Sequence, residues 1–93
     1  MPDDDNWLTD HFQQIGTRVR AERRRQGLTQ DQVWQAARID RRTLQNVEAG
    51  KEAKSGTLLR IAFVLDVPIA DLVGGPAEEE GGVAPTGRSR QEP

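Results

Sequence analysis

The 93-residue sequence contains no cysteine and a single histidine, His11. A chain without cysteine has neither disulfide bonds nor a cysteine-ligated zinc site, so packing alone must stabilise its fold. One histidine likewise excludes a multi-histidine metal site. No apolar run approaches the ~20 residues that a membrane-spanning helix requires, and the acidic start MPDDDN is unlike a signal peptide. We therefore expect a cytoplasmic protein with no membrane segment.

The sequence also lacks the signatures of an enzyme. It shows no nucleophile and base at a recognisable spacing, no glycine-rich phosphate loop and no metal-ligand spacing. The acidic run Asp3-Asp4-Asp5 belongs to a flexible end without fixed geometry, and His11 stands alone. We expect no catalytic activity, no metal and no cofactor.

Charge is distributed unevenly along the chain, although the net charge is only −2. Residues 10–73 carry eleven Lys and Arg against eight Asp and Glu, whereas both ends of the chain are acidic. Whole-chain charge is a poor guide when its sign differs between segments. The basic middle segment therefore leaves nucleic acid open as a partner.

Composition divides the chain into three parts. Residues 74–93, GGPAEEEGGVAPTGRSRQEP, are rich in Gly and Pro and poor in large apolar side chains. Such a segment buries too little surface to offset its ordering entropy, so we expect a disordered tail. Residues 1–6 look similarly flexible. The predicted folded domain is residues 7–73, small enough to hold one compact core.

Apolar residues in this domain recur at helical spacing, and no strand-like alternation appears. The first stripe comprises Leu8, Phe12, Ile15 and Val19. It predicts a helix that continues through AERRRQ and ends at Gly27, because glycine is the usual residue after a helix C-terminus. Thr29 and Gln32 have the spacing of a capping box. They predict a second helix over residues 30–37.

Three further helices follow. Asp40 is expected to cap a third helix over residues 41–49, which Gly50 would end. Ser55 is expected to cap a fourth helix, and Pro68 fits the first position of a short fifth helix. The apolar stripe of the fourth helix comprises Leu58, Ile61, Ala62 and Leu65. Five helices in so short a segment predict an all-α domain.

Only Arg38-Ile39-Asp40 joins the second and third helices, a connection typical of a helix-turn-helix. The segment GLTQDQVWQAARIDRRTLQNVEAGK resembles the helix-turn-helix of the Cro- and Xre-type, lambda-repressor-like DNA-binding proteins. TLLRIAFVLDVPIADLV, Thr57 to Val73, is similar to the fourth and fifth helices of that family. The resemblance runs from Ile15 to Val73 and implies a compact five-helix lambda-repressor-like domain.

Arg41 and Arg42 stand at the N-terminus of the third helix, where the helix dipole disfavours cations. Charges on a helix ordinarily mean a solvated face. In a helix-turn-helix, however, this end of the second helix meets base edges in the major groove. The resemblance implies base contacts by Arg41, Arg42 and Asn46, with Thr43 and Gln45 as secondary candidates. Arginine suits guanine, and asparagine suits adenine.

The resemblance also assigns supporting roles. Gln30 opens the second helix at a position that the family uses on a phosphate, and Lys51 and Lys54 are candidates for phosphate contact; ordinary loop lysines are the alternative. Arg23 and Glu48 occupy positions that pair across the first and third helices. Their role would be to brace the recognition helix, the alternative being that Glu48 faces solvent.

Two residues depart from the family pattern. Many members have glycine at the position of Arg38, and an arginine with positive φ costs roughly 1 kcal/mol relative to glycine. The position of Trp34 is usually small. A tryptophan there requires either a shifted helix crossing or a side chain lying across the groove between helices.

Apolar residues near the C-terminal end of the domain exceed what one small core requires. They are Phe63, Val64, Ile69, Leu72 and Val73. Some are expected in the core, and the rest could form a homodimer seam, since family members commonly bind two-fold operators. Two half-sites ~34 Å apart would then be expected on double-stranded DNA.

Two alternatives stay open. One is a protein-interaction module, antitoxin-like or anti-repressor-like, that keeps the fold and binds a protein partner through its acidic tail, because fold alone does not prove function. The other lies within the DNA-binding class. A restriction-modification control protein has a similar size to a bacterial or phage-type repressor, and the sequence does not separate them.

Overall fold

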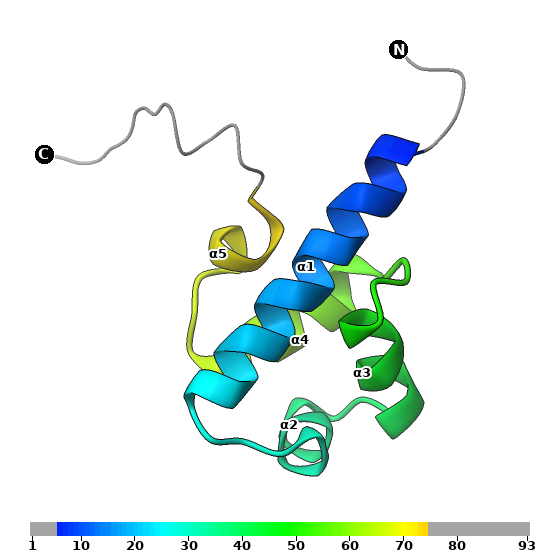
Figure 1. The fold of residues 1–93 in the computed structure, drawn as a ribbon. Coiled ribbons are helices and arrows are strands. Elements are labelled where there is room, and N and C mark those ends of the chain that lie inside the picture. The colour runs from blue at the N-terminus through cyan, green and yellow to red at the C-terminus, as the bar shows by residue number, and fades with distance from the viewer. Residues whose placement is uncertain (1–5, 75–93) are drawn as a thin grey trace, which may run out of the picture.

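The computed structural model describes residues 6–74, which fold into five α-helices with no strand among them (Figure 1). The helices are α1 (Asn6–Arg25), α2 (Gln30–Ala37), α3 (Arg41–Glu48), α4 (Ser55–Leu65) and α5 (Ile69–Val73). The predicted all-α fold is confirmed. The first helix begins one residue before the predicted domain boundary. The Asp3-Asp4-Asp5 run, and residues 75–93 of the predicted disordered tail 74–93, lie outside the described residues.

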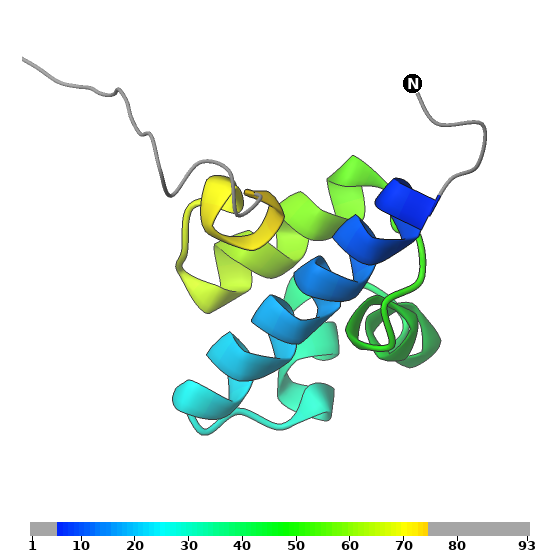
Figure 2. The ribbon, with the colours of Figure 1, turned by 45° about the horizontal axis from the view of Figure 1, so that its top comes forward.

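One apolar core joins all five helices. In both ribbon views α1 runs across the domain, with α5 on one side and α3 on the other (Figures 1 and 2). Burying each large aliphatic side chain contributes about 1.5–3 kcal/mol. The buried aliphatic side chains larger than alanine are Ile15, Val19, Val33, Leu44, Val47, Leu58, Ile61, Leu65 and Leu72. No helix within residues 6–74 combines the length and the apolar character needed to cross a bilayer.

Four of the helices end in the same way. Gly27, Arg38, Gly50 and Asp66 adopt positive φ of 72°, 60°, 89° and 60°. After each of them the next N–H bonds back to a carbonyl in the last helical turn, as Ile39 does to Trp34 at 3.1 Å. This arrangement satisfies carbonyls that would otherwise lack a partner. The strained conformation anticipated for Arg38 is therefore present.

The helix starts match the predictions less uniformly. Thr29 and Gln32 form the predicted capping box, with Gln32 N donating to Thr29 Oγ1 at 3.0 Å. Asp40 occupies the cap position of α3, but its side chain accepts no capping hydrogen bond, so that prediction is wrong. Asp40 is exposed, so its carboxylate is accessible to solvent.

Two other predicted starts are displaced by one residue. Lys54, not Ser55, is the cap residue of α4, and Pro68 precedes α5 as its cap residue. Neither side chain forms a capping hydrogen bond. Lysine has no acceptor to offer, and proline has none on its side chain. Both helices therefore depend on packing more than on their caps, α4 against α2 and α1, and α5 against α1 and α4.

Helices α1 and α3 approach each other closely at Gly16. A Cβ atom at Gly16 would lie 2.4 Å from the carbonyl oxygen of Val47 and 3.0 Å from that of Glu48. Only a residue without a side chain leaves room for these carbonyls. The position thus sets how closely α3 is held to α1.

Candidate nucleic-acid interface

Arg23 and Glu48, the pair expected to brace α3, form a buried bidentate ion pair. Arg23 Nε lies 2.6 Å from Glu48 Oε2, and Nη2 lies 3.0 Å from Oε1. The Glu48 side chain is 2% exposed. Hydrogen bonding to Glu48 raises the pKa of the Arg23 guanidinium above its ordinary value. The remaining Nη1 donates to the Leu28 carbonyl at 2.9 Å, so the cation is held on every edge.

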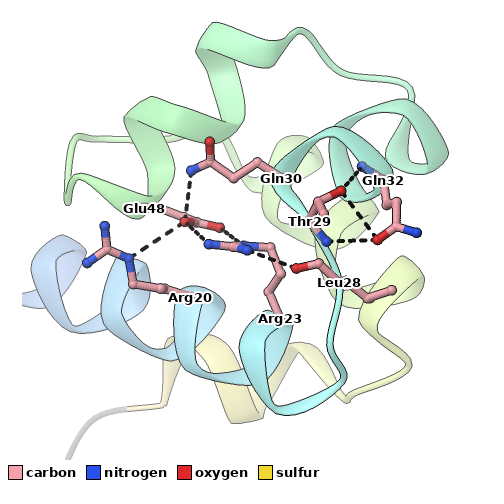
Figure 3. Close-up of polar contacts among 7 residues, drawn as sticks. All are labelled: Arg20, Arg23, Leu28, Thr29, Gln30, Gln32 and Glu48. Atoms are coloured by element: carbon pink, nitrogen blue, oxygen red, sulfur yellow. Dashed lines mark hydrogen bonds and ion pairs between the residues drawn. The ribbon is translucent and has the colours of Figure 1, made fainter.

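Two other side chains, those of Gln30 and Arg20, also contact the Glu48 carboxylate (Figure 3). Gln30 Nε2 donates to Glu48 Oε1 at 3.1 Å, and Arg20 Nε lies 3.8 Å from the same oxygen. We call Arg20, Arg23, Gln30 and Glu48 the Glu48 cluster. It joins α1, α2 and α3 at one buried carboxylate. With Leu44 and Val47 buried on the same helix, the cluster fixes the position of α3 on the domain.

Gln30, a candidate for phosphate contact, therefore also takes part in holding Glu48. Its amide N–H is directed at Glu48, and the residue is half-buried at the start of α2. The sequence predicted no link between Gln30 and Glu48, nor the approach of Arg20. Neither contact follows from spacing along the chain, because both depend on how closely α1 and α2 approach α3.

The outer face of α3 carries the candidates for base contact. Arg41, Arg42 and Gln45 are exposed. Within residues 6–74, the side chains of Arg42 and Gln45 form no hydrogen bond or ion pair. An exposed arginine without a partner at the positive end of a helix gains nothing from the domain itself.

Thr43 and Asn46 are half-buried and line a hollow of about 280 Å³ between α3 and the start of α4. Lys54 lines the same hollow, and Lys51 is exposed on the loop that leads to it. The structure therefore places two candidates for base contact beside a candidate for phosphate contact. Gln30, the third candidate for phosphate contact, instead donates its amide N–H to Glu48.

Arg41 differs from Arg42 because it is in contact with α2. Its Nε lies 3.6 Å from Asp31 Oδ1, and its guanidinium carbon lies 5.8 Å from the centroid of the Trp34 ring. Trp34 Nε1 donates to the same Asp31 oxygen at 2.8 Å. We call Asp31, Trp34 and Arg41 the Asp31 cluster. The large Trp34 side chain is thus accommodated half-buried against the start of α3.

Asp31 was not among the residues that the sequence singled out. The i, i+3 spacing of Asp31 and Trp34 on one helix is a signal that could have found their contact. The approach of Arg41 had no such signal, because it depends on the geometry of the turn between α2 and α3.

Of the apolar residues considered for a dimer seam, Phe63 stands out as 86% exposed. Leu72 is buried, whereas Val64, Ile69 and Val73 pack against the core. Leu59, one turn before Phe63, is 52% exposed and was not predicted. Both line a hollow of about 440 Å³ that also includes Arg38 and Arg60. We call Leu59 and Phe63 the α4 patch.

Among residues 6–74 no group of three potential ligand residues is placed to hold a metal ion. His11 is half-buried on α1.

Comparison with known proteins agrees with this arrangement. A family model described as a helix-turn-helix domain matches residues 14–73. The crystal structure of the restriction-modification controller protein C.AhdI from Aeromonas hydrophila is similar, with 27% sequence identity and a TM-score of 0.63. The similarity covers 66% of this chain and 94% of that protein. None of the curated proteins matches this chain in sequence.

Proposed function

Since the chain belongs to the helix-turn-helix domain family, with the helix arrangement of Cro- and Xre-type regulators, we propose that it binds specific DNA sequences through α3. In such domains the second helix of the motif lies in the major groove, and its N-terminal residues meet base edges. Arg42 is the principal base-contacting residue in this proposal. Arg41 and Asn46 are further base contacts, with Thr43 and Gln45 beside them.

One observation carries this proposal: Arg42 is exposed and has no partner within residues 6–74, on a helix whose position the Glu48 cluster fixes. A cation at a helix N-terminus is unfavourable, so the domain alone gives no reason for it. A guanine edge offers the pair of acceptors that a guanidinium fork binds. A fixed helix also keeps the entropy cost of ordering such contacts low.

Phosphate contacts would set the register of the domain on DNA. Lys51 and Lys54 lie on the loop between α3 and α4, and Lys54 lines the same hollow as Asn46. Gln30 stands at the start of α2, where free N–H groups also favour an anion. Such contacts supply affinity without sequence preference.

Regulation of transcription follows from this binding. The similar solved structure is that of a controller protein, and an occupied operator excludes other proteins from the same DNA. We therefore assign a repressor-like mode to this chain. A protein-interaction module without DNA binding is the second candidate. It is disfavoured because it gives no role to Arg42, which is exposed at the start of α3 and has no partner among residues 6–74.

The test is selection from random duplex DNA, followed by salt titration of the preferred sequence. We expect one enriched motif and an affinity that falls steeply between about 50 and 200 mM salt, because phosphate contacts release counterions. The double variant Lys51→Ala, Lys54→Ala should reduce the salt dependence and keep the motif. If no motif is enriched, or the affinity is indifferent to salt, the protein-interaction alternative is favoured.

We further propose that the protein acts as a homodimer on a two-fold operator, with the α4 patch as the contact between copies. Phe63 is 86% exposed and Leu59 is 52% exposed, one turn apart on the same face. Large apolar side chains exposed together are typical of a surface that binds another protein. Burying Phe63 against a second copy would remove it from water.

Sedimentation with and without the selected duplex tests the dimer. We expect Phe63→Gln to shift the protein toward monomer, while Trp7→Gln, at an exposed aromatic outside the patch, should not. The enriched motif should contain two half-sites about 34 Å apart. A wild-type protein that remains monomeric on DNA would exclude the dimer and leave DNA binding intact.

A further inference from the structure

The Asp31 cluster fixes one edge of the Arg41 guanidinium and leaves the other free. Asp31 Oδ1 accepts the Trp34 indole N–H at 2.8 Å and faces Arg41 Nε at 3.6 Å. The guanidinium carbon lies 5.8 Å from the Trp34 ring centroid. Within the described residues the terminal amino groups of Arg41 have no partner. Those two groups are the ones that bind a pair of acceptors.

The cluster does little for folding. The side chains of Arg41 and Asp31 are 60% and 58% exposed, and an exposed ion pair adds little to stability. An acidic residue beside a DNA-binding helix also repels the phosphates of its ligand. Asp31 therefore has a cost for binding, against which its position in the first turn of α2 gives a modest stabilisation through the helix dipole. Its contacts with Arg41 and Trp34 distinguish it from a carboxylate that serves the dipole alone.

We propose that Asp31 and Trp34 are positioning residues that direct the terminal amino groups of Arg41 toward the O6 and N7 atoms of one guanine. This inference rests on the proposed DNA-binding function. Asp31 engages the Nε edge and the Trp34 ring lies beside the guanidinium. Less rotamer freedom is then lost when Arg41 meets the base. Asp31 and Trp34 thus contribute to specificity without contacting DNA.

The proposal predicts opposite effects of Asp31 on affinity and on discrimination. Asp31→Asn removes a negative charge near DNA, so binding to all sequences should become tighter. The same change releases Arg41, so the preference for one guanine over other bases should fall about three- to tenfold. A residue that only supported the fold would not move these two quantities in opposite directions.

The experiment measures binding to the selected duplex and to its single-base-pair variants. Asp40→Asn is the matched control, because Asp40 is also exposed at the start of α3 and forms no capping hydrogen bond. It should tighten binding to all duplexes and leave discrimination at the guanine unchanged. Trp34→Phe keeps an aromatic ring but loses the N–H that holds Asp31, so it should give a smaller loss of discrimination than Asp31→Asn.

Repeating Asp31→Asn in an Arg41→Ala background tests whether the effect acts through Arg41. The loss of discrimination should then disappear, since the residue being positioned is absent. Equal loss in both backgrounds, or equal behaviour of Asp31→Asn and Asp40→Asn, would overturn the inference. So would a loss in Arg41→Ala that is uniform over all sequences, which would make Arg41 a phosphate contact. A wild-type protein without any preferred motif would instead contradict the proposed function.

Discussion

The Glu48 cluster and the Asp31 cluster both place a carboxylate against an arginine, at opposite ends of α3. At Glu48 the carboxylate is 2% exposed, and Arg23 approaches to 2.6 Å. At Asp31 the carboxylate is 58% exposed, and Arg41 stays 3.6 Å away. Burial makes the first cluster part of the fold, because breaking it would leave a charge in the interior. Exposure leaves the terminal amino groups of Arg41 in the second cluster accessible to a ligand.

The largest expected effect is that of Glu48→Ala, which leaves Arg23 buried without its partner. We expect the free energy of unfolding to fall by about 3–5 kcal/mol. Asp31→Asn should change it by less than about 1 kcal/mol, because that pair is exposed. Urea denaturation of the two variants checks this difference.

A double variant tests whether this loss of stability comes from the unpaired buried charge of Arg23. Replacing both partners, Arg23→Met with Glu48→Leu, should restore much of the stability that Glu48→Ala loses. If Glu48→Ala and Asp31→Asn cost the same, burial does not separate the two clusters.

Next in size is Gly16→Ala, which tests how closely the buried side of α3 is held to α1. The added Cβ would lie 2.4 Å from the Val47 carbonyl oxygen. We expect a loss of about 1–3 kcal/mol in unfolding free energy, measured by urea denaturation. Gly56→Ala is the control, since no atom lies within 4 Å of a Cβ there. It should be neutral or stabilising by up to about 1 kcal/mol, because alanine favours a helix. Equal costs at both glycines would contradict the close approach.

Arg38→Gly tests the turn between α2 and α3, which places Arg41 beside Asp31 and Trp34 of α2. Arg38 has φ of 60°, so glycine should raise the unfolding free energy by about 1 kcal/mol. Asp66 has the same φ, and Asp66→Gly should gain less, because aspartate tolerates this conformation better than arginine. Thermal or urea unfolding ranks the two variants. A destabilising Arg38→Gly would show that the arginine side chain contributes more than the strain costs.

The smallest effect is a dependence on pH at the exposed end of α1. Hydrogen bonds from Arg25 and Gln26 lower the pKa of Glu22 from 4.5 to about 2. A depressed pKa contributes stability that is present above pH 4.5 and is lost as the pH falls toward 2. Wild type should therefore be more stable than Glu22→Gln above pH 4.5, and acid titration should show this difference shrinking as the pH falls toward 2. A difference that stayed constant over that range would show that the Glu22 side chain acts through something other than its charge.

Sequence patterns predicted the helices well where the determinants are local. The capping box of Thr29 and Gln32 and the buried stripe of α4 depend on residues within one helix. The side chain of Asp40 was misjudged because a cap residue type does not fix its rotamer, and an exposed carboxylate has water as a rival partner.

The functional surface was only partly predictable. Arg41 and Arg42 look equivalent in the sequence, yet only Arg41 contacts Asp31 and Trp34. The difference depends on where the turn at Arg38 directs α3. Likewise, α4 carries the apolar residues Leu59 and Phe63 outside its core stripe, and only tertiary packing decides that they remain exposed.

The most direct test of the account is the sequence preference of Arg42→Ala, compared with wild type on the selected duplex and its single-base-pair variants. The structure leaves Arg42 exposed and unpartnered among the described residues. We predict a loss of about 1–3 kcal/mol confined to one base position, with the rest of the motif retained. Equal weakening on every sequence would contradict base recognition by Arg42 and make it a phosphate contact.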